Sequence, residues 1–381
     1  MRNRKISLPL GKASEAGFTL IELLVAAAVF LVVSGAAFAL FSQHQPLFSE
    51  QQNLADVNIA LRNSIAQMQL DIANAGANFS TSYTNTISPP GVVVTNNVVA
   101  AGGNCESGTP VVYGASCFDQ LSILTADANT PAANPTNGAG GCISTNSPGT
   151  AYLSLAGTTT GYGTTQATAT AAAAHYFLGD QIYFVTSNAS QYTTAILTAN
   201  GGTAKVGPDW FVLLTYGVTT STGQNSSTAN DPTNLTANFS SMLGATYCST
   251  DWVLRILPIT YSVNISVPTA PVLTRTVAGS AQTVSQTTLA TNIVGFKVGV
   301  STFNNPLDTY TTTYNFDART YSNGSGTDAY NFTLIRSVMV SLIGRTLPTT
   351  DPNYVFRNSF DGGAYQIQGV SAVVNPRNLS M

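Results

Sequence analysis

The sequence is poor in charged residues. Only 8% of its 381 residues are Asp, Glu, Lys or Arg, whereas ordinary soluble domains carry roughly 25%. Hydrophobic residues make up 44% of the chain and the formal net charge is −3, so the chain differs from disordered proteins, which combine low hydrophobicity with high net charge. The chain is therefore able to bury a core. Thr, Ser, Asn, Gln and Gly must cover its surface, which suits a packed or extracellular protein better than a cytosolic one.

Histidine and basic charge are also scarce, and this argues against several functions. The two histidines, His44 and His175, are too few for a histidine-based catalytic or metal site. An isoelectric point near 5.3 argues against a protein that binds DNA or RNA phosphates. The sequence contains no HExxH, GxSxG or P-loop motif and no zinc-type cysteine spacing. We therefore expect no enzymatic activity, no cofactor, no metal and no nucleic-acid partner.

Cysteine is rare as well, and its placement is informative. All four cysteines, Cys105, Cys117, Cys142 and Cys248, follow the strongly apolar segment near the N-terminus. If that segment spans a membrane, the thiols lie on the exported, oxidising side, where two disulfides are expected. Sequence alone does not choose among the three possible pairings. We favour Cys105–Cys117 as a local loop and Cys142–Cys248 as the second bridge, with unpaired buried thiols as the alternative.

The apolar segment covers residues 18–41 and reads FTLIELLVAAAVFLVVSGAAFALF, with Glu22 as its single charge. As a helix of 24 residues it would be about 36 Å long, enough to cross a hydrocarbon core of ~30 Å. Residues 1–17 carry four basic residues and one acid and end in Gly17. Because basic flanks stay in the cytoplasm, the remainder of the chain is predicted to be exported.

Gly17 and Glu22 do not fit an ordinary secretory signal. Such a signal places its small-residue cleavage site after the apolar run, whereas Gly17 precedes it. A lone ionised carboxylate costs roughly 2.5–3.5 kcal/mol or more inside a bilayer, so Glu22 needs a partner. Cleavage between Gly17 and Phe18 would supply one, because the new α-amino group of Phe18 lies one helical turn from Glu22. The alternative is a signal-anchor helix in which Glu22 is incidental.

The run Gly17-Phe18-Thr19-Leu20-Ile21-Glu22 resembles the prepilin signal of type IV pilins and of type II secretion pseudopilins. The resemblance implies that a membrane prepilin peptidase cleaves after residue 17 and N-methylates Phe18. The mature chain would then have 10 basic and 16 acidic side chains, because the leader removes four of the 14 and one of the 17.

The same resemblance implies a location and partners. Residues 18–41 would hold the chain in the inner membrane in a single pass, with the N-terminus cytoplasmic and the C-terminal head periplasmic. From there the chain would move into a pilus at the cell surface. The implied partners are the prepilin peptidase, other minor and major pilins, and the inner-membrane pilus assembly platform.

A second, amphipathic helical segment is predicted over residues 47–75. Its apolar residues recur every three, four or seven positions and form one stripe: Leu47, Leu54, Val57, Leu61, Ile65, Met68 and Ile72. Gly76 is a suitable stop for it. We therefore predict one long helix over residues 18–76, with a membrane half and a half packed on a globular head. Pro46 and Gly35 are predicted helix breaks, since proline removes a backbone hydrogen bond.

From residue 77 onward the sequence predicts β-strands separated by loops. The predicted strands are rich in Val, Ile, Thr, Tyr and Phe and cover residues 92–99, 121–125, 182–185, 211–216, 253–263, 293–300, 331–343 and 365–374. Residues 127–170 and 219–249 are dense in Thr, Asn, Gly, Ala and Ser. We predict these two stretches to be long surface loops without regular structure.

Three C-terminal segments resemble the PilW-like minor pilins and, less closely, the J-type minor pseudopilins: residues 289–300 (LATNIVGFKVGV), 332–345 (FTLIRSVMVSLIGR) and 370–379 (VSAVVNPRNL). The resemblance implies a pilin-like α+β fold, in which the long helix packs on an antiparallel β-sheet head. Residues 251–381 would form the PilW-like sheet region, and residues 77–250 a large insertion of strands and loops.

Two functions follow from these resemblances, and the Tyr- and Asn-bearing polar loops of residues 77–250 suggest a third. The first is a minor pilin that contributes to assembly, priming or the tip of a type IV pilus. The second is a minor pseudopilin of a type II secretion system. The third is a tip adhesin or receptor that acts through residues 77–250.

Overall fold

The computed structural model describes residues 19–77, 91–95, 97, 105–108, 110–145, 149–187, 192–217, 246–278, 284–304, 309–310, 314, 335–348 and 356–378. The chain divides into two compact units, residues 1–53 and 54–381. The second unit is called the head below. The architecture is α+β, as predicted: one long N-terminal helix is followed by antiparallel sheets.

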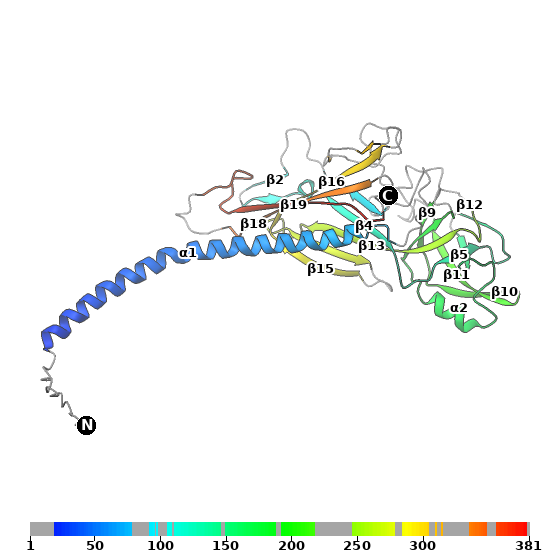
Figure 1. The fold of residues 1–381 in the computed structure, drawn as a ribbon, viewed down its shortest axis with the longest axis horizontal. Helices are drawn as coiled ribbons and strands as arrows, with labels where there is room; N and C mark the ends of the chain where they lie inside the picture. The colour runs from blue at the N-terminus through cyan, green and yellow to red at the C-terminus, as the bar shows by residue number, and fades with distance from the viewer. Residues whose placement is uncertain are drawn as a thin grey trace, which may run out of the picture. The chain divides into compact units, whose positions relative to one another are not determined.

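Helix α1 runs from Leu20 to Ala73 and crosses the boundary between the two units (Figure 1). It ends where Gly76 adopts a φ of 70° and donates its N–H to the Leu124 carbonyl at 2.8 Å, as is common for a glycine after a helix end. The predicted breaks at Gly35 and Pro46 are wrong, because the backbone is helical through both positions. A proline removes one backbone hydrogen bond, and the bonds of the neighbouring turns suffice to keep this backbone helical.

In the first unit, residues Leu20–Phe41 form an apolar stretch of 22 residues with a mean hydropathy of 2.6. Its length and composition are those of a helix able to cross a membrane. None of this stretch is buried, and its large side chains, such as Leu31 and Phe38, are exposed by 69% and 74%.

In the head, α1 buries the C-terminal part of the predicted stripe, while the side chain of Leu47 lies outside the described residues. Leu61, Ile65, Met68 and Ile72 are at most 5% exposed and belong to the larger of two hydrophobic cores. The amphipathic half of the helix is therefore confirmed, and its apolar face packs on the sheets of the head.

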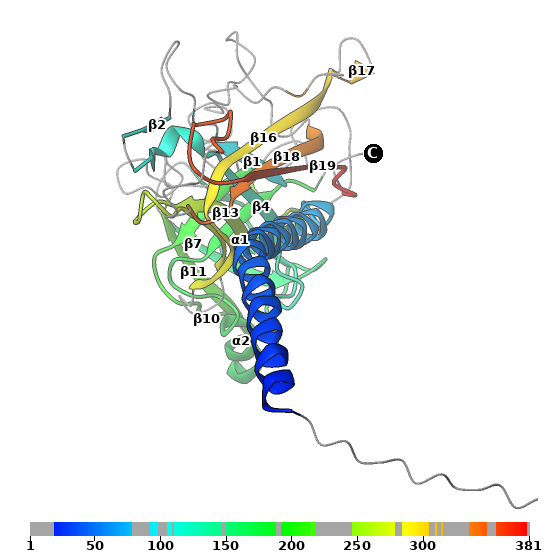
Figure 2. The same cartoon turned by 90° about the vertical axis from the view of Figure 1, so that its left-hand side faces the viewer.

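A four-stranded antiparallel sheet covers part of this helical face. Its order is β17-β16-β18-β19, and Figure 2 shows β16, β18 and β19 side by side. The bounds of these strands are Ile293–Asn304 for β16, Thr309–Tyr310 for β17, Ile335–Arg345 for β18 and Ile367–Val374 for β19. Gly344 of β18 lies so close to the helix that an added Cβ would come within 3.2 Å of Val57.

The larger, 11-stranded antiparallel sheet is built around one long strand, β13. The C-terminal half of β13 pairs with β4, which pairs in turn with β1, and with β14, which pairs with β15. The bounds are Val92–Thr95 for β1, Gln120–Ala126 for β4, Trp252–Asn264 for β13, Val272–Ala278 for β14 and Val284–Thr291 for β15.

The N-terminal half of β13 belongs to a closed barrel. Six antiparallel strands form a ring in the order β13-β5-β7-β11-β9-β8 and back to β13. The remaining bounds are Ala133–Thr136 for β5, Gly149–Leu155 for β7, Gln181–Val185 for β8, Tyr192–Leu197 for β9 and Asp209–Gly217 for β11. Leu153, Phe184 and Leu214 are fully buried in the second core, which fills the barrel, as expected for a ring of so few strands.

Short elements complete the barrel and the neighbouring surface. Strand β10 (Gly202–Val206) extends the sheet beside β11, and helix α2 (Gln166–Ala173) contributes Ala173 to the barrel core. The others are β2 (Glu106–Ser107), β3 (Val112–Tyr113), the 3₁₀ helix η1 (Ala115–Cys117), β6 (Ile143–Ser144) and β12 (Thr246–Tyr247).

Two predictions for this region need correction. Residues 127–170 are not structureless, since β5, β6, β7 and part of α2 lie within them. Because these residues are rich in Thr, Ala and Gly, they lack the clear alternation of apolar and polar side chains that predicts a strand. They form strands because they pair with strands that are distant in the sequence. The boundary predicted at residue 250 also fails to separate two structures, because β13 pairs with β4, β5 and β8. Each predicted strand has an observed counterpart. Residues 219–245 of the second predicted loop lie outside the described residues, and its described end is not structureless, because β12 lies there.

Candidate functional site

The candidate site is the start of α1, where the carboxylate of Glu22 lies. Gly17 and Phe18, between which cleavage is predicted, lie outside the described residues. Thr19 donates its backbone N–H and its hydroxyl to the same Glu22 oxygen, Oε2, each at 2.9 Å. The Glu22 N–H donates in return to the Thr19 hydroxyl oxygen at 3.4 Å. This reciprocal pattern is a capping box, which satisfies backbone donors that a helix start leaves unpaired.

Sequence reasoning missed the role of Thr19, although its signal was present. The spacing Thr-x-x-Glu immediately before an apolar run is typical of a capping box. Both Thr19 bonds reach Oε2, so the other oxygen of Glu22 accepts none of the hydrogen bonds found among the described residues at this helix end. Since the helix dipole also favours negative charge here, the carboxylate is held at the helix start with an oxygen available to a cation.

The surroundings of Glu22 are apolar and exposed. Ile21 and Val25 are 71% and 59% exposed, and the apolar surface continues to Phe41. An added Cβ at Gly35 would meet nothing within 4 Å, so no close approach among the described residues requires a glycine there. This half of α1 therefore offers a continuous apolar surface with one carboxylate at its start.

The four cysteines form two disulfides in the head, in the pairing favoured from the sequence. Cys105 is bonded to Cys117, and Cys142 to Cys248. The first bridge ties β2 to η1, and the second joins the ends of β6 and β12, which pair with each other. Both bridges are placed to stabilise loops of the fold.

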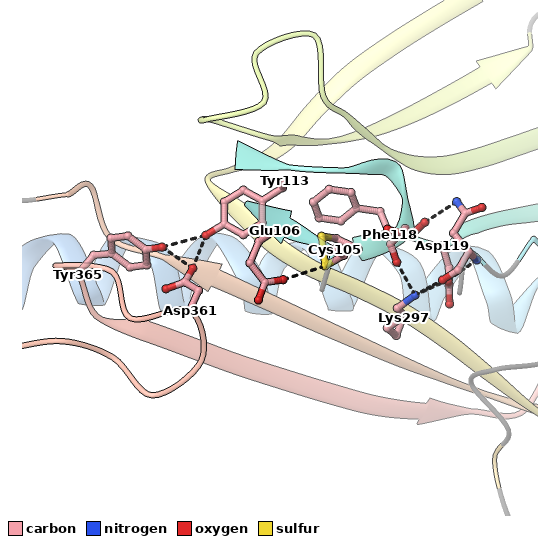
Figure 3. The surroundings of a disulfide bond; sticks show 11 residues. Cys105, Glu106, Tyr113, Phe118, Asp119, Lys297, Asp361 and Tyr365 are labelled. Carbon is pink, nitrogen blue, oxygen red and sulfur yellow. Dashed lines mark hydrogen bonds and ion pairs between the residues drawn. A yellow bond between two sulfur atoms is a disulfide. The ribbon is translucent and has the colours of Figure 1, made fainter. Parts of the chain in front are cut away.

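A lysine anchors the segment that carries the first disulfide (Figure 3). Lys297 of β16 donates from Nζ to the Asp119 carboxylate at 3.0 Å and to the carbonyl oxygens of Asn97 and Ser116 at 2.5 and 3.2 Å. The Asp119 side chain is 0% exposed and accepts the Val298 N–H at 2.9 Å. This ion pair, whose carboxylate is buried and whose lysine is partly exposed, fixes the disulfide-bonded segment onto β16.

A second polar cluster joins β3 to the loop before β19 (Figure 3). Tyr113 donates its hydroxyl to Asp361 at 2.5 Å, and Tyr365 donates to the same carboxylate. Burial raises the pKa of both tyrosines. Burial alone would raise the pKa of Asp361, but hydrogen bonds from the two tyrosines, Asn358 and Gly363 outweigh it and lower that pKa. The Arg345 guanidinium stacks on both rings, 4.5 Å from the centroid of Tyr365 and 5.4 Å from that of Tyr113.

Comparison with known protein families identifies one motif, at the N-terminus of the chain. The family model described as the prokaryotic N-terminal methylation motif matches residues 12–38, which include Gly17, Phe18 and Glu22. A type IV-like pilin from Thermus thermophilus aligns in structure with a TM-score of 0.19 and 12% identity, over 33% of this chain and 70% of that one. That score is too low to carry an argument. No curated protein matches the chain in sequence.

Proposed function

Because the chain carries a prokaryotic N-terminal methylation motif that continues into an exposed apolar helix, we propose that it is a minor pilin of a type IV pilus. The motif itself supports a type IV pilin-like protein and its processing by a prepilin peptidase. The observation that carries the proposal is Glu22, which is held by Thr19 at the very start of the apolar helix.

Processing would proceed between Gly17 and Phe18, followed by N-methylation of Phe18. The basic leader would remain in the cytoplasm, and Leu20–Phe41 would hold the chain in the inner membrane with its head in the periplasm. Two disulfides in the head support an oxidising compartment. The partners would be the peptidase, other minor and major pilins, and the assembly platform.

The working step would be charge pairing inside an apolar environment. Cleavage frees a cationic α-amino group on Phe18, and the Glu22 carboxylate is its natural partner on the same chain or on a neighbour. The capping box leaves one Glu22 oxygen for that contact. A subunit that pairs this charge would leave the lipid at lower cost, since an unpaired carboxylate is poorly tolerated there. The role is structural, without catalysis.

The head supports the role of a minor pilin, which primes assembly or lies at the tip, over that of the major pilin that forms the filament. The head carries a closed barrel in addition to the sheets that pack on α1. Such an added barrel enlarges each subunit, which suits a position at the end of a filament better than a repeated position along it. The PilW-like C-terminal segments support the same role.

The test compares Glu22→Ala and Glu22→Gln with Asp56→Asn, a control that removes an exposed carboxylate further along the same helix. We expect all three chains to be cleaved before Phe18, as shown by mass spectrometry of the mature N-terminus. Both Glu22 variants should fall at least about tenfold in sheared pili, because the charge is lost in each. Normal piliation with Glu22→Ala would refute the proposal.

A type II secretion pseudopilin with the same anchor is the first alternative. Deleting the gene would separate the two systems: loss of pili supports the pilus, and loss of exoprotein secretion with intact pili supports the alternative.

A tip adhesin is the second alternative, and the closed barrel favours it. The barrel has its own core and its own disulfide, Cys142–Cys248, as a binding module would. Point changes on exposed barrel residues that abolish adhesion while pili still assemble would support this function.

A further inference from the structure

Glu106 places a carboxylate against the Cys105–Cys117 disulfide (Figure 3). Its Oε2 atom lies 3.3 Å from Cys105 Sγ, and one of its carboxylate oxygens lies within 4.8 Å of both sulfur atoms. Because the two sulfurs are bonded to each other, neither carries a proton that it could donate to Glu106. The contact therefore brings a negative charge to the disulfide without a hydrogen bond to stabilise that charge.

The backbone holds this carboxylate in place. Glu106 begins β2 and pairs with Tyr113 of β3, while Cys105 lies at a bend just before β2. Successive side chains of a regular strand point to opposite faces, so it is the bend that lets the side chains of Cys105 and Glu106 lie together. The Gly114 N–H donates to the Cys105 carbonyl at 2.8 Å, which fixes the bend against β3.

The charge of Glu106 has no cationic partner in the described part of the chain, where each ion pair involves another carboxylate. Lys297 bonds the carbonyl of Ser116, the residue before Cys117, but its ammonium group is paired with Asp119 at 3.0 Å. The charge of this lysine is therefore already balanced, and the Glu106 carboxylate acts on the disulfide without a counter-charge of its own.

Burial decides which sulfur of this disulfide a thiol can reach. Cys117 is 3% exposed and belongs to the larger core, whereas Cys105 is half-buried and packs against that core. Exchange begins when a thiolate attacks one sulfur and the other leaves as a thiolate. The attack must therefore fall on Cys105, the sulfur beside Glu106. The Cys117 thiolate would then be released among apolar side chains, where a charge is poorly tolerated.

We propose that Glu106 protects the Cys105–Cys117 disulfide from reduction by repelling anionic thiols from Cys105. In the step concerned, the thiolate sulfur bonds to Cys105 Sγ, the bond to Cys117 breaks, and Cys117 keeps the electron pair and takes a proton from water. A second thiolate then releases the oxidised thiol dimer from Cys105. A carboxylate a few ångströms away disfavours the approach of an anion, whereas a thiol whose own ammonium group balances its thiolate is repelled far less.

This protection concerns the head alone and is independent of the proposed function. It keeps η1 bonded to the β2–β3 hairpin, in the segment that Lys297 anchors on β16.

The test measures how fast each disulfide of the folded full chain is reduced by two small thiols, in an uncharged detergent. Mercaptoethanesulfonate is anionic, and cysteamine carries an ammonium group. Timed samples are quenched with iodoacetamide, and mass spectrometry of the peptides reports Cys105–Cys117 and Cys142–Cys248 separately. Glu106→Gln removes the charge and keeps the shape. Asp56→Asn is the control, because it removes an exposed carboxylate on α1.

We expect Glu106→Gln to speed the reduction of Cys105–Cys117 by mercaptoethanesulfonate about fivefold or more, the effect of one unit charge at ~4 Å in water. With cysteamine the rate should change by less than about twofold. The adduct trapped at early times should be on Cys105, with Cys117 alkylated. Equal acceleration with both thiols would show that the side chain only covers the sulfur and would overturn the proposal, as would an adduct on Cys117.

Two further measurements serve as controls. Asp56→Asn should leave both disulfides unchanged, and Glu106→Gln should leave Cys142–Cys248 unchanged. In the unmodified chain, molar salt should raise the mercaptoethanesulfonate rate relative to the cysteamine rate at Cys105–Cys117, with Cys142–Cys248 as the reference. The reason is that the screening length falls from ~10 Å at ~0.1 M salt to ~3 Å at ~1 M. An unchanged ratio would overturn the proposal, even if Glu106→Gln failed to fold.

Discussion

Asp71 is the residue through which the helix in the head is bonded to the large sheet. Its carboxylate accepts the Tyr261 hydroxyl at 2.5 Å and Arg275 Nε at 2.7 Å. The hydrogen bond to Asp71 is the main cause that raises the pKa of Arg275, so this guanidinium stays charged. The Asp71 side chain is 11% exposed and that of Arg275 22%. Breaking a pair so shielded from water costs more than breaking a surface ion pair, because it leaves a partly buried charge without its partner.

Replacing Asp71 by Asn should weaken the head. The amide keeps the shape but loses the charge, which leaves Arg275 without its anion, so we expect a loss of about 1–3 kcal/mol in the free energy of unfolding. Urea unfolding of the full chain in detergent measures it. Asp56→Asn is the control, since Asp56 is exposed on the same helix. Equal stabilities for the two variants would contradict this role.

At the scale of elements, the two disulfides close chain segments of very different length. The bridged cysteines are 12 residues apart in Cys105–Cys117 and 106 residues apart in Cys142–Cys248. The longer segment includes β7, α2, β8, β9, β10 and β11. A longer closed loop restricts the unfolded chain more, so the second bridge should matter more to stability.

Replacing each cysteine pair by serine tests this order. The chain-entropy estimate gives a loss of about 5 kcal/mol for Cys142→Ser with Cys248→Ser, and about 3 kcal/mol for Cys105→Ser with Cys117→Ser. Urea unfolding under oxidising conditions compares the two pairs. The opposite order would show that local packing around η1 outweighs the constraint on the unfolded chain.

At the scale of the whole molecule, β13 and Arg255 couple the two cores of the head. On β13, Ile256 lies in the larger core and Val253 in the barrel core. Arg255 between them is 4% exposed and binds Asp127, which follows β4, and Asp180, which precedes β8, each at 2.7 Å. One buried cation therefore bonds a loop of each part of the head.

Arg255→Met should destabilise both cores together by about 3–5 kcal/mol, because two buried carboxylates then lose their cation. We expect one unfolding transition with coincident midpoints by tryptophan fluorescence and far-ultraviolet circular dichroism. Adding Asp127→Asn and Asp180→Asn to the variant should recover part of the loss. Two separated transitions would mean that the barrel unfolds independently.

Local patterns in the sequence determined much of this protein. The prepilin-type motif, the apolar run, the stripe from Leu54 to Ile72 and the position of each predicted strand all depend on residues near one another in the chain. Thr19 could have been found in the same way, from its spacing to Glu22. The preferred cysteine pairing also agreed with the structure, although four cysteines permit three pairings.

Only the tertiary structure decided how these elements join. The barrel closes because β13 accepts β5 on one side and β8 on the other, and the Ala- and Thr-rich β5 and β7 show too little alternation to be recognised alone. The contact of Asp71 with Tyr261 joins residues 190 positions apart. The physical reason is the sequence separation of the interacting residues. Local periodicity predicts which face of a helix or strand a residue lies on. Strand pairing, barrel closure and buried ion pairs depend on residues far away in the sequence, which a local pattern does not identify.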